Sequence, residues 1–306
     1  MNILHLKYAV EVAKTGSINK AADTLLIAQP NLSRSIKELE SDLGIAIFER
    51  TAKGMVLTPE GEEFMGYANS ILNQINSVEK MYKTGIPAKK HFSVSVPRST
   101  YISEAFAQFS KTLPKDAVEV FYKETNSSRA IKNIMYENYK LGIVRYAENH
   151  DKYFKMMFDE KGLTNELVAE FHYILLMNKN CPLAKLPQIC FSDLEKYIEI
   201  AHADPYVPSL SASQVRKEEL PDNVSRRIFV FERASQFDLL SENEEAFMWV
   251  SPIPQKTLDR YGLVQRECSD NRRGYRDVLV YKKDYKLTSL DKSFITEVCL
   301  SRRKYL

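Results

Sequence analysis

A short run of polar and cationic side chains lies between residues 29 and 37. Its members can form hydrogen bonds or ion pairs, and they are Gln29, Asn31, Ser33, Arg34 and Lys37. Gln and Asn can contact adenine through two hydrogen bonds, Arg can contact guanine in the same way, and Lys can hold a phosphate. A solvated helix face has a similar composition, so the interpretation depends on the elements that present these residues.

Helical periodicity precedes this run. Apolar residues recur at the spacing of one helix face between Leu6 and Ala13, and again between Ile18 and Leu25. The first helix is expected to end near Gly16, and Ser17 is the expected N-cap of the second. Two short helices in immediate succession are therefore predicted.

The polar run falls on a third predicted helix. Pro30 suits its first turn and Gly44 its end, and its apolar stripe is formed by Leu32, Ile36, Leu39 and Leu43. Only residues 26–28 separate it from the second helix, which is typical of a helix-turn-helix. In that motif the second helix of the pair enters the major groove of DNA.

A short hairpin is predicted next, with strands at 47–50 and 55–58 joined by 51–54. Its Arg50 and Lys53 would meet the phosphate backbone as the wing of a winged helix-turn-helix. We therefore predict contacts with double-stranded DNA from Ser17, Gln29, Pro30, Asn31, Ser33, Arg34, Lys37, Arg50 and Lys53.

A long helix follows Thr58, whose side chain is a suitable N-cap, and Pro59, which suits a first turn. Apolar residues on it are spaced by 4, 3, 4, 3 and 4 positions, and they are Phe64, Ala68, Ile71, Ile75, Val78 and Tyr82. This spacing is typical of a coiled coil, so a homodimer is predicted, which would bind an inverted-repeat DNA site. The alternative is that the helix packs on its own C-terminal domain.

From residue 92 onward strands and helices alternate, which predicts parallel sheets in two α/β lobes with a cleft between them. Ligands bind such sheets at the carboxyl ends of strands. Polar residues expected there are Ser99, Thr100, Asn126, Ser127, Ser128 and His202. We predict that they contact a small-molecule effector, although each is equally typical of a helix cap or turn.

These patterns define a multidomain chain with an N-terminal, all-α winged helix-turn-helix, a long linker helix and a C-terminal α/β domain. The predicted ranges are 1–58 for DNA binding, 59–86 for the linker and dimerisation helix, and 87–306 for the effector domain. Within the last range, lobe I spans about 90–161 and 267–306, and lobe II about 162–266.

Composition is that of an ordinary folded protein, with 44% hydrophobic and 27% charged residues among 306. Neither a membrane span nor a signal peptide is expected, so a cytoplasmic location is predicted. The four cysteines show no metal-binding spacing, and neither a metal nor a cofactor is predicted. A redox response through Cys181 and Cys190, which flank a proline-containing loop, is one alternative.

Other functional classes have less support. Nucleophile-elbow, phosphate-loop, dinucleotide and zinc-protease motifs are missing, so an enzyme is not expected. A solute-binding protein is a further alternative, but it would need neither a basic wing nor a heptad helix.

The N-terminal quarter resembles the LysR-type family of bacterial transcriptional regulators. The resemblance is carried by 6–13, GS (16–17), AADTL (21–25), QPNLS (29–33), IKELE (36–40), LG (43–44), FER (48–50) and LTPEG (57–61). It implies a dimerising linker helix, a periplasmic-binding-protein-like effector domain and, commonly, a homotetramer. It also implies an inducer near Ser99, Thr100 and Ser128, and RNA polymerase is a further partner to consider.

Overall fold

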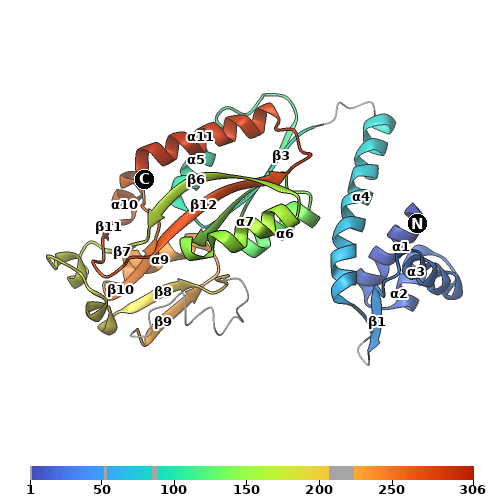
Figure 1. Cartoon of the computed structure of the whole chain (residues 1–306), viewed down its shortest axis with the longest axis horizontal. Helices are drawn as coiled ribbons and strands as arrows, with labels where there is room; N and C mark the ends of the chain where they lie inside the picture. Colours follow the sequence, from blue (N-terminus) through green and yellow to red (C-terminus); the bar gives the residue numbers. More distant parts are fainter. Residues whose placement is uncertain (1, 52–53, 85–88, 207–223) are drawn as a thin grey trace. The chain divides into compact units, whose positions relative to one another are not determined.

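The structure, a computed structural model, describes residues 2–51, 54–84, 89–206 and 224–306. The chain forms two compact units, residues 1–90 with 132–139 and residues 91–131 with 140–306 (Figure 1). None of the described helices has the length and apolar character needed to span a membrane. The predicted boundary at 86/87 lies outside the described residues.

The first unit contains the predicted winged helix-turn-helix. Its elements are α1 (Ile3–Thr15), α2 (Ile18–Leu25), α3 (Gln29–Leu43), β1 (Phe48–Thr51), β2 (Gly54–Leu57) and α4 (Pro59–Thr84). Gly16 and Gly44 end α1 and α3 in the left-handed conformation, and the Ser17 side chain caps α2, as the sequence predicted. The core joins α1, α2, α3 and the wing around Ala9, Leu32 and Leu39.

The first half of helix α4 packs against α1. Ala68 and Leu72 form a buried cluster with Leu6, and Phe64 and Ile71 pack against it. The first half of the predicted heptad stripe is therefore covered by the chain's own N-terminal helix, an arrangement that the sequence pattern did not indicate. Farther along, Val78 is 54% exposed and Tyr82 is 79% exposed.

The second unit contains two sheets. The first has the strand order β4-β3-β5-β12-β6. Its strands are β3 (Lys90–Val96), β4 (Val118–Glu124), β5 (Leu141–Ala147), β6 (Leu163–His172) and β12 (Gly274–Lys282). β3 runs parallel to β5 as expected, but β12 is antiparallel to both β5 and β6. The sheet is thus mixed, because β12 returns from the second lobe in the opposite direction.

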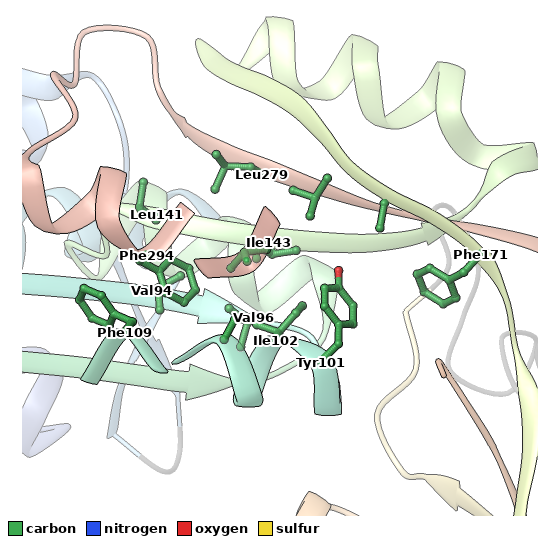
Figure 2. Close-up of a cluster of buried hydrophobic side chains, with 14 of the residues drawn as sticks. Val94, Val96, Tyr101, Ile102, Phe109, Leu141, Ile143, Phe171, Leu279 and Phe294 are labelled. Carbon is green, nitrogen blue, oxygen red and sulfur yellow. The ribbon is translucent and has the colours of Figure 1, made fainter. Parts of the chain in front are cut away.

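Helices cover this first sheet on both faces. They are α5 (Thr100–Ser110), α6 (Ser127–Tyr136), α7 (Asp151–Glu160) and α11 (Ser289–Tyr305), with η1 (Glu148–His150) before α7. α5 and α11 pack together over one face. Figure 2 shows the resulting core, in which Phe109 and Phe294 meet Val94 and Ile143 from the strands.

The second sheet has the order β11-β7-β10-β8-β9. Its strands are β7 (Ile174–Asn178), β8 (Ile198–His202), β9 (Arg226–Val230), β10 (Ala246–Val250) and β11 (Leu263–Arg266). The accompanying helices are η2 (Pro182–Lys185), η3 (Phe191–Lys196), α9 (Arg233–Glu242) and α10 (Gln255–Tyr261). β8 runs parallel to β9 and β10, which places the carboxyl ends of these strands at one edge.

Strand β6 belongs to the first sheet, although the sequence pattern assigned residues from about 162 onward to lobe II. It pairs with β12 from Leu163 opposite Lys282 to His172 opposite Gly274. Only Tyr173 separates β6 from β7, so one extended run crosses from sheet to sheet. A continuous run contains no local signal that marks where the crossing occurs.

Candidate DNA-reading helix and interlobe cavity

The polar face of α3 points away from the protein. Gln29, Asn31, Arg34 and Lys37 are exposed, as is Pro30, and Ser33 is half-buried. On the opposite face Leu32, Ile36 and Leu39 are buried in the core. The hydrophobic face therefore orients α3 so that its hydrogen-bonding groups are available to another molecule. Leu43, which was expected to continue the buried stripe, is exposed because it lies at the end of the helix.

Arg34 has a partner on its own helix. Its Nε donates to Oε1 of Glu38 at 2.9 Å, and the Arg34 side chain is 82% exposed. Oε2 of Glu38 lies 3.9 Å from Nε2 of His5 on α1. An exposed pair of this spacing stabilises a helix by only about 0.3–0.5 kcal/mol, so Arg34 can exchange Glu38 for a base or a phosphate at small cost.

The wing is anchored to the corner between α1 and α2. The Met55 amide donates to the Gly16 carbonyl at 2.9 Å. Gly54 has φ 118°, and a Cβ there would lie 2.5 Å from the Gly16 carbonyl oxygen. Only glycine fits this close approach without displacing the backbone. Arg50 is exposed on β1, and Lys53 lies outside the described residues.

A second set of bonds ties the start of the wing to α3. Oε1 of Glu40 accepts from the amides of Ile47 at 2.8 Å and Phe48 at 3.1 Å. The Thr58 hydroxyl donates to the Ala46 carbonyl at 2.6 Å and accepts from the Gly61 amide at 2.9 Å. Sequence reasoning identified Thr58 as a cap but missed Glu40, because its partners are turn amides.

A cavity of about 850 Å³ lies in the second unit, with walls from both lobes. Three of the predicted effector residues, Asn126, Ser127 and His202, line it. Ser99 and Thr100 are buried at the start of α5, where the Ser99 hydroxyl lies 3.2 Å from that of Ser251, and Ser128 is half-buried. These last three predicted residues are not among those that line the cavity.

Arg98 and Asp204, from opposite lobes, meet in the cavity wall. Nη1 and Nη2 of Arg98 donate to Oδ1 and Oδ2 of Asp204 at 2.8 and 3.2 Å. Nδ2 of Asn126 donates to the Asp204 carbonyl at 3.0 Å, while its Oδ1 accepts from the Arg129 amide at 2.8 Å. Asn126 is thus both the helix cap and the cavity residue that its sequence position suggested. Arg98 and Asp204 were not identified from the sequence.

Arg145 supplies a second cation to the cavity. Its Nε and Nη2 donate to the buried Asp277 carboxylate, both at 2.7 Å, and Asp277 also accepts from the Tyr101 hydroxyl at 2.7 Å. Burial disfavours the charged guanidinium, but the attraction of Asp277 and neighbouring tyrosines outweighs it and raises the pKa of Arg145. The guanidinium lies 4.7 Å from the centre of the Phe171 ring. Arg145 therefore remains a fixed positive charge.

His202 is neutral at physiological pH. Burial lowers its pKa to about 4, with the positive charge of Arg98 as the next cause. Its Nδ1 is buried and has no hydrogen-bond partner within the described ranges, and the same holds for the indole Nε1 of Trp249. Both residues line the cavity.

Aromatic rings complete the walls. Tyr146 stacks on Phe154 with ring centres 4.2 Å apart, and Tyr173 stacks on Tyr275 at 4.1 Å. A concave, partly aromatic site with a few fixed polar groups is suited to holding a small organic molecule.

The two cysteines considered for a redox response are not joined by a disulfide and lie in different surroundings. Cys181 is fully buried, and burial raises the pKa of its thiol, which disfavours the reactive thiolate. Sγ of Cys190 lies 3.3 Å from the hydroxyl of Ser269. The redox alternative stays a prediction.

Known proteins resemble this chain in its helix-turn-helix region and along nearly its whole length. A family model described as "Bacterial regulatory helix-turn-helix protein, lysR family" matches residues 3–62. The regulator BenM of Acinetobacter baylyi is 45% identical over 83 residues, which is 27% of each chain. The regulator AlsR of Bacillus subtilis is 24% identical over 290 residues, 93% of this chain and 91% of that protein. The match to BenM thus spans about a quarter of that protein's length.

Solved structures with the same fold include full-length regulators. CbnR in complex with its target DNA has a TM-score of 0.57 at 19% identity, over 98% of this chain and 100% of that chain. LysG from Corynebacterium glutamicum with bound effector Arg has a TM-score of 0.59 at 13% identity, over 100% and 99%. At these identities the likeness concerns the fold of the chain.

Proposed function

We propose that this chain is a LysR-type DNA-binding transcriptional regulator, because the lysR-family helix-turn-helix model matches residues 3–62 and AlsR aligns over 93% of the chain. In this proposal it binds an inverted-repeat DNA site as a homodimer or homotetramer. We further propose that a small molecule in the interlobe cavity modulates this binding. The relatives are regulators rather than enzymes, and the cavity accordingly serves binding.

The orientation of α3 carries the DNA proposal. Burial of Leu32, Ile36 and Leu39 leaves the opposite face, with Arg34 and Lys37, exposed. Base contacts are assigned to Gln29, Asn31, Ser33 and Arg34 with Pro30 beside them, and phosphate contacts to Ser17, Lys37, Arg50 and Lys53. Because the Arg34–Glu38 pair is exposed to solvent, the arginine can leave Glu38 and turn toward DNA.

Self-association is assigned to the outer half of α4. Phe64, Ala68 and Ile71 already pack on or beside α1, whereas Val78 and Tyr82 remain largely exposed. A second copy of α4 would cover these side chains together with Ile75. The outer half of the apolar stripe on α4 would then be buried by the partner helix, as its first half is already covered by α1.

The effector is assigned to the cavity. Its volume of about 850 Å³ is within the range of small-molecule sites. Asn126, Ser127 and His202 lie in its wall, and Ser99, Thr100 and Ser128 are retained as proposed contacts through the family resemblance. The solved structure of LysG, which shares this fold, holds its effector Arg.

Selection of bound duplexes from a random pool, followed by footprinting, tests the DNA proposal. We expect enrichment of a twofold-symmetric motif with half-sites about one helical turn apart. Enrichment of asymmetric sites only, or of none, would contradict it. Metabolite screening by thermal unfolding tests the effector, since a ligand at a hundred times its Kd stabilises the protein by about 2.7 kcal/mol.

A further inference from the structure

One carboxylate of the chain itself occupies a position suited to a ligand. Arg98 follows β3, Asn126 follows β4 and Asp204 follows β8, so all three lie just beyond the carboxyl ends of strands. All three line the cavity. The strand ends of both lobes thus converge on the side chain of Asp204.

The contacts of Asp204 are those that proteins use for free carboxylates. Both carboxylate oxygens accept from the terminal nitrogens of Arg98, at 2.8 and 3.2 Å, which is the paired geometry that arginine forms with carboxylates. Nδ2 of Asn126 lies 3.3 Å from Oδ2. The Arg98 side chain is 13% exposed and that of Asp204 is 33% exposed, so the site is largely enclosed but can be reached from outside.

We propose that Asp204 is an internal occupant of a carboxylate site formed by Arg98 and Asn126, and that the effector is an organic anion whose carboxylate displaces it. This inference rests on the proposed effector role of the cavity. When the anion displaces Asp204, Arg98 pairs with the ligand and loses its ion pair with lobe II. Binding of the anion therefore alters how the lobes are held together.

The electrostatics around Arg98 favour this exchange. His202 is neutral and brings no competing positive charge. A partly buried guanidinium without a partner is strongly unfavourable, so the site requires an anion whenever Asp204 leaves. Removing Asp204 should therefore convert a weak site for external carboxylates into a much stronger one.

A matched control exists elsewhere between the lobes. Nε of Arg233 donates to both oxygens of Glu124 at 2.9 Å, and the two side chains are 20% and 19% exposed. Neither residue lines the cavity. Glu124→Ala therefore removes an interlobe ion pair of similar burial without opening a carboxylate site in the cavity.

The experiment uses the full-length protein and acetate as the probe. Sodium acetate replaces sodium chloride at constant ionic strength, and the emission of Trp249, the chain's single tryptophan and a cavity residue, is followed together with the unfolding temperature. For Asp204→Ala we expect a saturable response with a half-saturating concentration at least about tenfold below that of the unchanged protein. Glu124→Ala should respond like the unchanged protein.

Two further variants keep the test decisive. Arg98→Ala introduced into Asp204→Ala should abolish the acetate response, because the site loses its cation. Asp204→Asn, which retains the size and one oxygen of the aspartate, should show an intermediate response and serves where the alanine variant fails to fold. Equal responses of the unchanged protein and both Asp204 variants, or a response that survives loss of Arg98, would overturn the proposal.

Measuring the affinity of each variant for the selected DNA distinguishes failure of this inference from failure of the proposed effector role. Acetate binding to Asp204→Ala with no change in DNA affinity would support the carboxylate site and contradict the effector role. A screened metabolite that changes DNA affinity, together with no acetate response in either Asp204 variant, would support the effector role and contradict the assignment of Asp204.

Discussion

Arg98 and Asp204 form a two-point ion pair across the cavity although 106 positions separate them in the sequence. Arg98 follows a strand of the first sheet and Asp204 follows a strand of the second, so the ion pair links the two lobes directly. A change that moves these two strand ends apart would lengthen or break it.

Removing the cation of this pair should destabilise the second unit. Arg98→Ala leaves the Asp204 carboxylate partly buried and without its main partner, and we expect a loss of about 1–3 kcal/mol in the free energy of unfolding. Urea denaturation measures it. Arg226→Ala is the control, since the Arg226–Glu245 pair is 50% and 66% exposed and should contribute below about 1 kcal/mol. Equal losses would show that burial of the Arg98 pair is unimportant.

Arg34 and Arg50 should differ in how they affect DNA binding. Arg34→Ala is expected to cost about 1–3 kcal/mol on the selected site and little on random DNA, because the variant lacks the proposed base contact. Arg50→Ala should weaken binding to all sequences alike and lower the slope of log affinity against log salt by about one. Gel-shift titrations at several salt concentrations separate the two effects. An Arg34→Ala loss that is the same on both DNAs would assign Arg34 to phosphate.

The close contact between the wing and the α1–α2 corner predicts unequal effects of two glycine substitutions. Gly54→Ala places a methyl group against the Gly16 carbonyl oxygen at a φ of 118°, and we expect a loss of about 2–4 kcal/mol in the stability of the first unit. Gly44→Ala meets no atom within 4 Å and should cost only about 1 kcal/mol for its left-handed backbone. Thermal unfolding of the two variants compares them. Equal shifts would mean that the wing is not held against the α1–α2 corner.

The outer half of α4 should control the oligomeric state. Val78→Glu leaves the isolated chain largely unaffected because the side chain is mainly exposed, yet it would bury an unpaired charge between two copies. We expect a shift toward monomer in analytical ultracentrifugation. Asn76→Glu, exposed on the same helix but off the stripe, should leave the mass unchanged. Retention of full mass by Val78→Glu would exclude this seam.

His202 should make the stability of the second unit sensitive to acid. The pKa of His202 is lowered from 6.5 to about 4 in the folded protein. Between these values the unfolded chain binds a proton that the folded chain does not, so stability falls as the pH drops through this window. His202→Gln should flatten the decline in denaturation experiments between pH 6.5 and 4. The same substitution at the exposed His172 is the control, and identical curves for the two variants would refute the assignment.

Local signals explain what the sequence could predict. The helix ends at Gly16 and Gly44, the cap at Ser17 and the buried stripe of α3 depend on neighbours a few positions away, and the structure has all of them. Asn126 and His202 were found because the carboxyl ends of strands are predictable positions.

Contacts between distant segments were beyond such reasoning. Arg145 and Asp277 are 132 positions apart, and nothing near either residue marks the other as its partner. The contact of Ala68 with Leu6 was missed for a similar reason, since a heptad stripe shows that a helix has a partner without showing which one it is.

The central place of β12 has a consequence for synthesis of the chain. When residue 266 has been made, every described strand of the second sheet exists, but the first sheet still lacks the strand that pairs with both β5 and β6. Until then those strands present unpaired edges, which favour aggregation and engagement by chaperones. We therefore expect the lobe that leaves the ribosome first to be the last to finish folding.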